Sequence, residues 1–140
     1  MSKLKVFSDE WCKTWEETIR ASKDFAVYNK GWKGDIGGIM NADPSRNLPE
    51  TQYLYMHFDD GKVISIRMTD KETAENAKFV ITGDYIRWKQ VALGELDAVK
   101  AMMQGKLKLK GNLPYVVKYV KGVQESIRCL TELDSEFPDD

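Results

Sequence analysis

The sequence has little of what metal sites and disulfide frameworks require. It contains one histidine, His57, and two cysteines, Cys12 and Cys129, which lie far apart and outside any CxxC pattern. A metal site needs several ligands of fixed geometry, so we predict neither a metal site nor a cofactor. We expect two reduced, buried thiols in a cytoplasmic protein, although the sequence leaves a disulfide between them open.

Long apolar runs and an excess of one charge are also missing. The 140 residues are 42% hydrophobic and 31% charged, with a net charge of −1. No run reaches the roughly 18 apolar residues of a membrane-spanning helix, so we expect no stable membrane insertion. The balanced charge argues against a nucleic-acid partner, which usually requires a basic face. A length of 140 residues is typical of one domain with its own core, so we expect a single domain over residues 1–140.

The two ends of the sequence resemble no targeting signal. Residues 1–5 contain lysines, but no apolar stretch of a signal peptide follows them. Residues 136–140 do not form a peroxisomal address. Residues 133–140 are mainly acidic, and we expect them to form a mobile tail.

Catalytic chemistry is similarly scarce. A Ser/His or Cys/His pair would have to use His57, and neither cysteine has a suggestive context. Asp59 and Asp60 precede Gly61, where turn formation explains them better than acid–base catalysis. We therefore expect that the protein is not an enzyme.

The first half of the chain predicts a helix followed by strands. Apolar residues recur at helical spacing over residues 9–30, with a break expected near Ser22. Residues 35–42 form a glycine-containing strand, in which the glycines leave room for a close neighbour. Two further strands, 51–58 and 62–69, flank the turn at Asp59-Asp60-Gly61.

The second half predicts a strand at 77–82, a helix at about 85–93 and a compact helix–strand unit. In this unit Asp97 caps a short helix, Gly105 ends it, and lysines alternate with leucines over 106–110. Lysines on one face are typical of a protected edge strand. A last helix is expected over 113–131, with a continuous apolar stripe. The order predicts an α+β fold, with helices covering one face of a five-stranded, mostly antiparallel sheet.

One stretch of the sequence resembles a known family. Residues 79–90, FVITGDYIRWKQ, and residues 94–111, GELDAVKAMMQGKLKLKG, are similar to the signature region of the sterol carrier protein type 2 domain family. The chain looks like a prokaryotic-type, stand-alone sterol carrier protein. It differs from the eukaryotic carriers in lacking their peroxisomal C-terminus, so we do not expect a peroxisomal sterol role. The resemblance implies an apolar tunnel between sheet and helices that holds a fatty acid, a fatty acyl-CoA, a phospholipid or a sterol-like ligand.

The resemblance also suggests which residues line the tunnel. Methionine adapts to more than one apolar shape, although ordinary core packing explains each of these side chains equally well. Three lysines, at 106, 108 and 110, could meet a charged headgroup at a tunnel mouth or could serve only solubility. The candidate lining residues are Phe79, Ile81, Trp88, Val99, Met102, Met103, Leu107 and Leu109, with Leu113, Val117 and Val120 as a lid.

Three functions remain open from the sequence. The first is a non-catalytic lipid carrier. The second is a protein–protein interaction or dimerisation module without bound lipid, and a homodimer is compatible with the sequence. The third is a small enzyme acting on a lipid or acyl-thioester through Asp84, His57 or a tyrosine.

Overall fold

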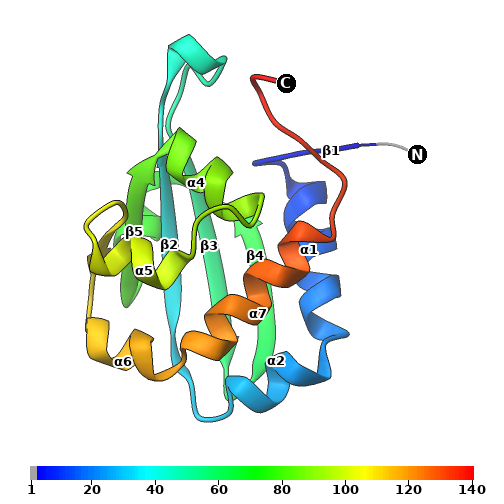
Figure 1. The fold of residues 1–140 in the computed structure, drawn as a ribbon, viewed down its shortest axis with the longest axis vertical. Helices are drawn as coiled ribbons and strands as arrows, with labels where there is room; N and C mark the ends of the chain where they lie inside the picture. Colours follow the sequence, from blue (N-terminus) through cyan, green and yellow to red (C-terminus); the bar gives the residue numbers. More distant parts are fainter. Residues whose placement is uncertain (1–2) are drawn as a thin grey trace.

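The computed structural model describes residues 3–140 and confirms the α+β fold (Figure 1). A five-stranded sheet has the strand order β4-β3-β2-β5-β6. Neighbouring strands are antiparallel except β2 and β5, which run parallel. The strands are β2 (Lys33–Asn41), β3 (Gln52–Asp59), β4 (Lys62–Met68), β5 (Phe79–Asp84) and β6 (Lys108–Lys110).

A layer of helices covers one face of this sheet, with α7 crossing in front of the strands (Figure 1). One short helix, α3 (Lys71–Glu75), does not belong to this layer. A Cβ on Gly37 of β2 would overlap the Ala74 backbone in α3, whereas a Cβ on the next residue, Gly38, would approach Trp88 in the helical layer. Adjacent strand residues point to opposite faces, so α3 lies on the outer face. The covering helices are α1 (Asp9–Arg20), α2 (Lys23–Tyr28), α4 (Tyr85–Ala92), α5 (Ala98–Met103), α6 (Leu113–Lys118) and α7 (Val120–Thr131), and a 3-10 turn, η1 (Pro44–Arg46), precedes β3.

Side-chain caps set the helix boundaries in the first half of the chain. Ser8 Oγ accepts a hydrogen bond from the Trp11 amide at 3.2 Å, and Ser22 Oγ accepts one from the Phe25 amide at 3.1 Å. A second cap inside the predicted 9–30 helix starts a new helix at Lys23. The break predicted near Ser22 is therefore confirmed.

The predicted single helix over 113–131 is wrong. Two helices, α6 and α7, meet at Tyr119, whose φ of −106° and ψ of 28° are not helical. The Tyr119 side chain is buried, and its ring packs edge-on against Trp32 at a centroid distance of 5.3 Å. Tertiary packing of one aromatic side chain thus interrupts a stripe that continues through the sequence.

The edge strand is shorter than the predicted 106–110. The amides of Lys106 and Leu107 both donate to the Ala101 carbonyl, at 2.8 and 3.2 Å, and close the end of α5. Only residues 108–110 remain to pair with β5. The predicted edge position is confirmed, because β6 pairs with β5 alone among residues 3–140.

The end of the chain packs against the domain. A short strand, β7 (Ser135–Glu136), pairs in parallel with β1 (Leu4–Lys5), and Phe137 is 6% exposed. The Asp139 carboxylate accepts hydrogen bonds from Tyr85 Oη at 2.6 Å and from Lys89 Nζ at 2.9 Å. These contacts argue against the mobile tail that the acidic composition of residues 133–140 suggests.

Cys12 and Cys129 are both free and buried, so the disulfide that the sequence leaves open is not formed. Burial raises the pKa of both thiols, and nearby acidic residues raise it further. The described helices include none that is long and apolar enough to cross a membrane.

Candidate functional site: an apolar cavity beneath the helical layer

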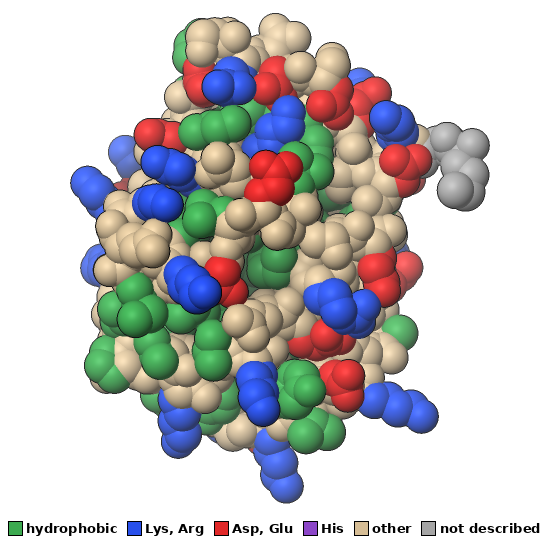
Figure 2. Space-filling view, in the orientation of Figure 1, with side chains coloured by type: hydrophobic (Ala, Val, Ile, Leu, Met, Phe, Trp, Pro, Cys, Tyr) green, Lys and Arg blue, Asp and Glu red, His purple; other side chains and the backbone are tan. Residues whose placement is uncertain are grey.

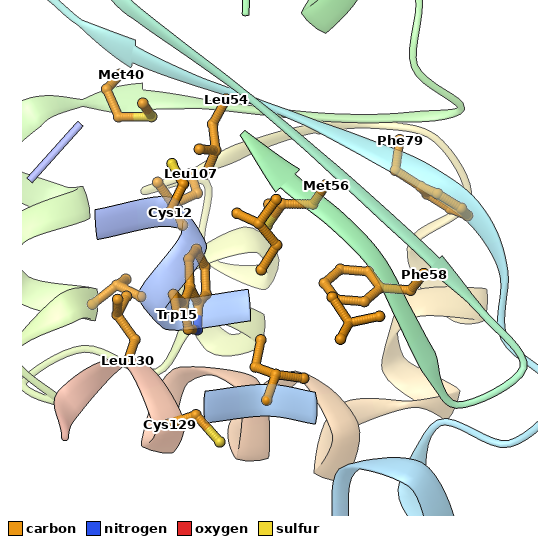
Figure 3. Packing of buried hydrophobic residues seen from close by; sticks show 14 of the residues in the cluster. Cys12, Trp15, Met40, Leu54, Met56, Phe58, Phe79, Leu107, Cys129 and Leu130 are labelled. Atoms are coloured by element: carbon orange, nitrogen blue, oxygen red, sulfur yellow. The ribbon is translucent and has the colours of Figure 1, made fainter. Parts of the chain in front are cut away.

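A cavity of about 80 Å³ lies between the sheet and the helices. Its sheet side is built from β2, β3, β5 and β6, and its helical side from α1, α2, α4, α5, α6 and α7. Figure 3 shows the Trp15 side chain of α1 directed toward the strand that carries Met56 and Phe58, β3. All three side chains belong to the hydrophobic core between the sheet and the helices. The cavity therefore lies where the sequence predicts an apolar space.

Six of the eleven predicted lining residues surround this cavity. They come from β5, α4, α5, β6 and the loop before β6, and all of them lie in the stretch that resembles the carrier family. The six are Phe79, Ile81, Trp88, Met102, Leu107 and Leu109.

The other five predicted residues do not line it. Val99 is buried in the hydrophobic core but not at the cavity. Leu113 and Val120 are partly buried and pack against the hydrophobic core. Met103 is 62% exposed and Val117 is 37% exposed. Successive helical residues are about 100° apart around the axis, so a Met102 that points inward directs Met103 toward solvent.

Fourteen of the twenty residues that line the cavity are not among the predicted lining residues. Trp15 belongs to the apolar stripe of the first helix, but periodicity alone cannot show that this stripe reaches a cavity. Ala98 carries no signal at all. The lining residues that sequence reasoning missed are Trp15, Phe25, Asn29, Trp32, Ile36, Met56, Phe58, Val91, Ala98, Val116, Gly122, Val123, Ser126 and Ile127.

The three tryptophans of the wall offer no free hydrogen-bond donor to the cavity. Trp15 Nε1 donates to the Ser126 carbonyl at 2.8 Å, and Trp32 Nε1 donates to the Gly34 carbonyl at 2.8 Å. Trp88 Nε1 donates to the Ile39 carbonyl at 3.0 Å. Because each indole N–H is bonded to backbone, the rings present apolar surface to the interior.

One polar side chain, Asn29, is buried at the cavity edge with 6% exposure. Its Nδ2 donates to the Phe25 carbonyl at 3.1 Å. A Cβ on Gly122 would overlap the Asn29 amide, so glycine lets α7 approach α2 at this point. Asn29 therefore packs against α7 at Gly122, and its amide nitrogen is bonded to the backbone of α2.

A second cavity, of about 30 Å³, lies beside the first. Both cavities contact Trp15, Trp88, Val91 and Ile127, so these four side chains separate them. Phe137 of the C-terminal segment lines the second cavity. The structure therefore has two separate apolar cavities in place of the single tunnel that the resemblance predicts.

The candidate catalytic residues do not converge on either cavity. His57 alternates with Met56 and Phe58 on β3, so it points to the opposite face of the sheet. Asp84 is exposed, and its carboxylate accepts a hydrogen bond from Asn41 Nδ2 at 3.1 Å. Within residues 3–140 no group of three or more His, Cys, Asp or Glu side chains could hold a metal ion.

An acidic residue with a shifted pKa lies on that outer face. Asp35 of β2 lies opposite His57 of β3 in the strand register. Partial burial raises the pKa of its carboxyl, but hydrogen bonds from the Lys78 amide at 2.7 Å and Tyr55 Oη at 2.8 Å lower it more, so its pKa lies below the ordinary value. Asp35 therefore links β2 to Tyr55 of β3 and to the backbone just before β5 as an ionised acceptor.

Comparison with known sequences agrees with this geometry. Residues 46–123, more than half of the chain, match the sequence profile of the SCP-2 sterol transfer family. The chain belongs to the SCP-2 sterol transfer family. The matched segment includes the strands and helices that supply all six correctly placed lining residues. No curated protein sequence matches the chain.

Solved structures of SCP-2 proteins share the fold. A crystal structure of sterol carrier protein 2 superposes with a TM-score of 0.82 at 23% identity, covering 91% of this chain and 98% of that one. A conserved hypothetical protein from Thermus thermophilus superposes with a TM-score of 0.84 at 23% identity, covering 97% and 94%. Sterol carrier protein 2 from Aedes aegypti, in complex with the C16 fatty acid palmitate, has a TM-score of 0.53 at 15% identity, covering 88% and 96%.

Proposed function

We propose that this protein is a non-catalytic lipid carrier that holds the apolar part of a fatty acid, a fatty acyl-CoA, a phospholipid or a sterol-like ligand beneath its helical layer. The observation that carries the proposal is the cavity between sheet and helices, whose tryptophan N–H groups are all bonded to backbone. Membership of the SCP-2 sterol transfer family supports it. We propose the cytoplasm as its location and residues 1–140 as its single domain.

Burial of an acyl chain supplies the main favourable contribution to this function. Each methylene group removed from water contributes about 0.8 kcal/mol, so a chain of about fourteen methylenes contributes roughly 11 kcal/mol before the costs of binding. Micromolar affinity corresponds to a net binding free energy of about 8 kcal/mol, which leaves roughly 3 kcal/mol of this gain for the costs of binding.

The cavity must enlarge to accept such a chain. Its volume of about 80 Å³ is well below the roughly 300 Å³ at which ordinary ligand pockets begin. Met56 and Met102 in its wall are unbranched and adapt to new shapes. Displacement of Trp88 and Ile127, which separate the two cavities, would join them into one longer space.

The walls predict which part of the ligand decides affinity. Asn29, the buried polar side chain at the cavity edge, already donates to a backbone carbonyl. Among residues 3–140 no charged side chain lines the larger cavity, so a charged headgroup in the interior would lose its hydration without gaining an ion pair. We expect the headgroup to remain at the surface, and affinity to depend on chain length more than on headgroup.

Extraction and ligand titration test the proposal together. Native mass spectrometry of freshly purified protein, followed by organic extraction, is expected to reveal a bound lipid. A fluorescent C16 fatty acid is expected to bind with micromolar or tighter affinity. Ala98→Phe places a ring in the cavity and is expected to weaken this binding at least about tenfold, an effect of about 1.4 kcal/mol.

The matched control is Val27→Phe, which adds a similar ring to a side chain that is 71% exposed on α2. It is expected to leave the affinity unchanged. Circular dichroism and thermal unfolding establish that both variants are folded. Absence of any extracted lipid, together with no fatty-acid binding by the unmodified protein, would reject the carrier function.

An interaction or dimerisation module is the second candidate. The observation that favours it is the exposure of Met103 and Val117 on neighbouring helices α5 and α6. Sedimentation velocity over a range of protein concentrations distinguishes the two candidates. A stable dimer that dissociates on Met103→Glu and binds no lipid would favour the module.

A further inference from the structure

Positive charge is concentrated in one continuous segment of the chain. Residues 98–124 contain six lysines and no aspartate or glutamate. Because the whole chain has a net charge of −1, the residues outside this segment carry −7. The segment forms α5, β6, α6 and the start of α7, which are neighbours in the fold (Figure 1).

The lysines of this segment are exposed and unpaired by carboxylates. None of them forms an ion pair with a residue of the described chain, 3–140, whereas Lys33 and Lys89 do. Their charges are therefore available to an external anion. They are Lys100, Lys106, Lys108, Lys110, Lys118 and Lys121.

Apolar side chains are exposed between these lysines. Met103 on α5 is 62% exposed, Val117 on α6 is 37% exposed, and Pro114 at the start of α6 is also exposed. Figure 2 shows hydrophobic side chains gathered over α6 and α5, with lysine or arginine side chains around them. Lys108 and Lys110 flank the cavity-lining Leu109 on β6 and therefore point to the opposite face of the sheet. We call the outer surface formed by Lys100, Met103, Lys106, Pro114, Val117 and Lys118 the α5–α6 face.

We propose that the α5–α6 face docks on the surface of an anionic lipid bilayer. Exposed apolar side chains surrounded by lysines are the combination that binds such a surface, since the apolar groups enter the interface and the lysines contact anionic headgroups. A second copy fits this face poorly, because a two-fold interface would place like-charged lysines against one another. Charge complementarity therefore favours the bilayer.

Docking by this face places the cavity next to the membrane. The same elements that carry the lysines outward direct Ala98, Met102, Leu107 and Val116 into the cavity wall. Displacement of α5 or α6 at the bilayer would open the cavity toward the lipid. The docking itself does not require bound lipid, whereas this role in loading and unloading rests on the proposed function.

Vesicle co-sedimentation tests the proposal. The probes are vesicles of phosphatidylcholine alone and vesicles that also contain phosphatidylserine. We expect binding only to the latter, and we expect it to weaken as salt is added, because salt screens the lysines. Lys100→Glu/Lys106→Glu is expected to weaken binding at least about 25-fold, since each lysine near an anionic surface contributes about fivefold.

Two matched controls locate the docking surface. Lys13→Glu/Lys62→Glu makes the same charge change at exposed lysines on α1 and β4, and we expect less than about a twofold effect. Met103→Glu is expected to reduce binding, whereas Ile64→Glu is not, because Ile64 is 49% exposed on β4, at the other edge of the sheet.

Four results would overturn the proposal. They are equal binding to neutral vesicles, no binding to anionic vesicles, equal losses in the control variants, and a dimer in solution that Met103→Glu dissociates. Lipid extraction from the purified protein is independent of vesicle binding. A protein that contains lipid but ignores vesicles would reject only the docking, and one that binds vesicles but takes up no lipid would reject only the carrier function.

Discussion

The two ends of the apolar space beneath α7 are held together in different ways. At one end, beside the second cavity, Phe137 is buried and Asp139 is anchored by Tyr85 and Lys89. At the other end, α5, β6 and α6 present unpaired lysines and an exposed Met103. One end is fastened by directional polar contacts between distant parts of the chain, and the other mainly by apolar contacts.

The polar contacts at the α5–α6 end are few and lie at its margins. Gln124 Nε2 donates to the Asp97 carboxylate at 3.1 Å, and the Lys33 amide donates to Tyr115 Oη at 3.0 Å. Between them β6 contributes only three residues to the sheet edge. We infer that the apolar space opens at the α5–α6 end and stays closed at the tail end.

The largest effect is expected at the tail end. Phe137→Ala removes a buried ring and is expected to lower the free energy of unfolding by about 3 kcal/mol. Urea unfolding followed by circular dichroism measures this change. The corresponding variant at the open end, Met103→Ala, is expected to change it by no more than about 0.5 kcal/mol. Similar losses in the two variants would remove the contrast between the ends.

Replacement of the Asp139 carboxylate, at the same end, is expected to have a smaller effect on the free energy of unfolding. Partial burial raises the pKa of Asp139, but hydrogen bonds from Tyr85 and Lys89 lower it more, to about 2. Because the folded-state pKa lies below the ordinary value, the stabilisation is complete above about pH 5 and is lost as the pH falls toward 2. Asp139→Asn is expected to cost about 1–2 kcal/mol at pH 7, and this cost is expected to decline through pH 2 and to vanish below it. A cost that does not decline on acidification would show that the carboxylate charge is not responsible.

Hydrogen exchange compares the two ends directly. Amides of α5, β6 and α6 are expected to exchange at least about tenfold faster than those of α4, a difference of about 1.4 kcal/mol in local opening free energy. Mass spectrometry of peptides or NMR measures the rates in the absence of lipid. Bound C16 fatty acid is expected to slow exchange most at α5 and α6. Faster exchange at α4 would place the opening at the tail end instead.

The smallest effect on ligand uptake is expected from Met103→Arg. Met103 faces solvent and does not line the cavity, so fatty-acid affinity is expected to change by less than about twofold. Met102→Arg, one residue earlier, places the same charge in the cavity wall and is expected to abolish uptake. Thermal unfolding of both variants serves as the folding control. Equal uptake by both variants would exclude Met102 from the ligand site.

Local signals predict most of the fold. The caps at Ser22 and Asp97, the turn at Gly61 and the lysine alternation on β6 depend on neighbours in sequence, and the structure has each of them. The break at Tyr119 escaped prediction because it depends on Trp32, which is distant in sequence. The packed tail escaped it for the same reason, since its acidic composition conceals the buried Phe137.

The candidate site was predictable only in part. The family-like stretch supplies Phe79, Ile81, Trp88, Met102 and two leucines of the cavity wall. Periodicity could not distinguish Met102 from Met103, because a helix of six residues has no long stripe to fix its inward face. The remaining wall comes from residues of α1 to β3, from α7 and from Val91, Ala98 and Val116, and its recognition required the tertiary arrangement.

The most direct test of the account is an isotope-filtered NOE experiment on the complex with C16 fatty acid. We predict contacts from the middle of the acyl chain to the methyl groups of Met102, Leu109 and Ile127, which line the larger cavity. Contacts restricted to exposed Ile64 or Met103, with no contact to the cavity methyl groups, would contradict the account.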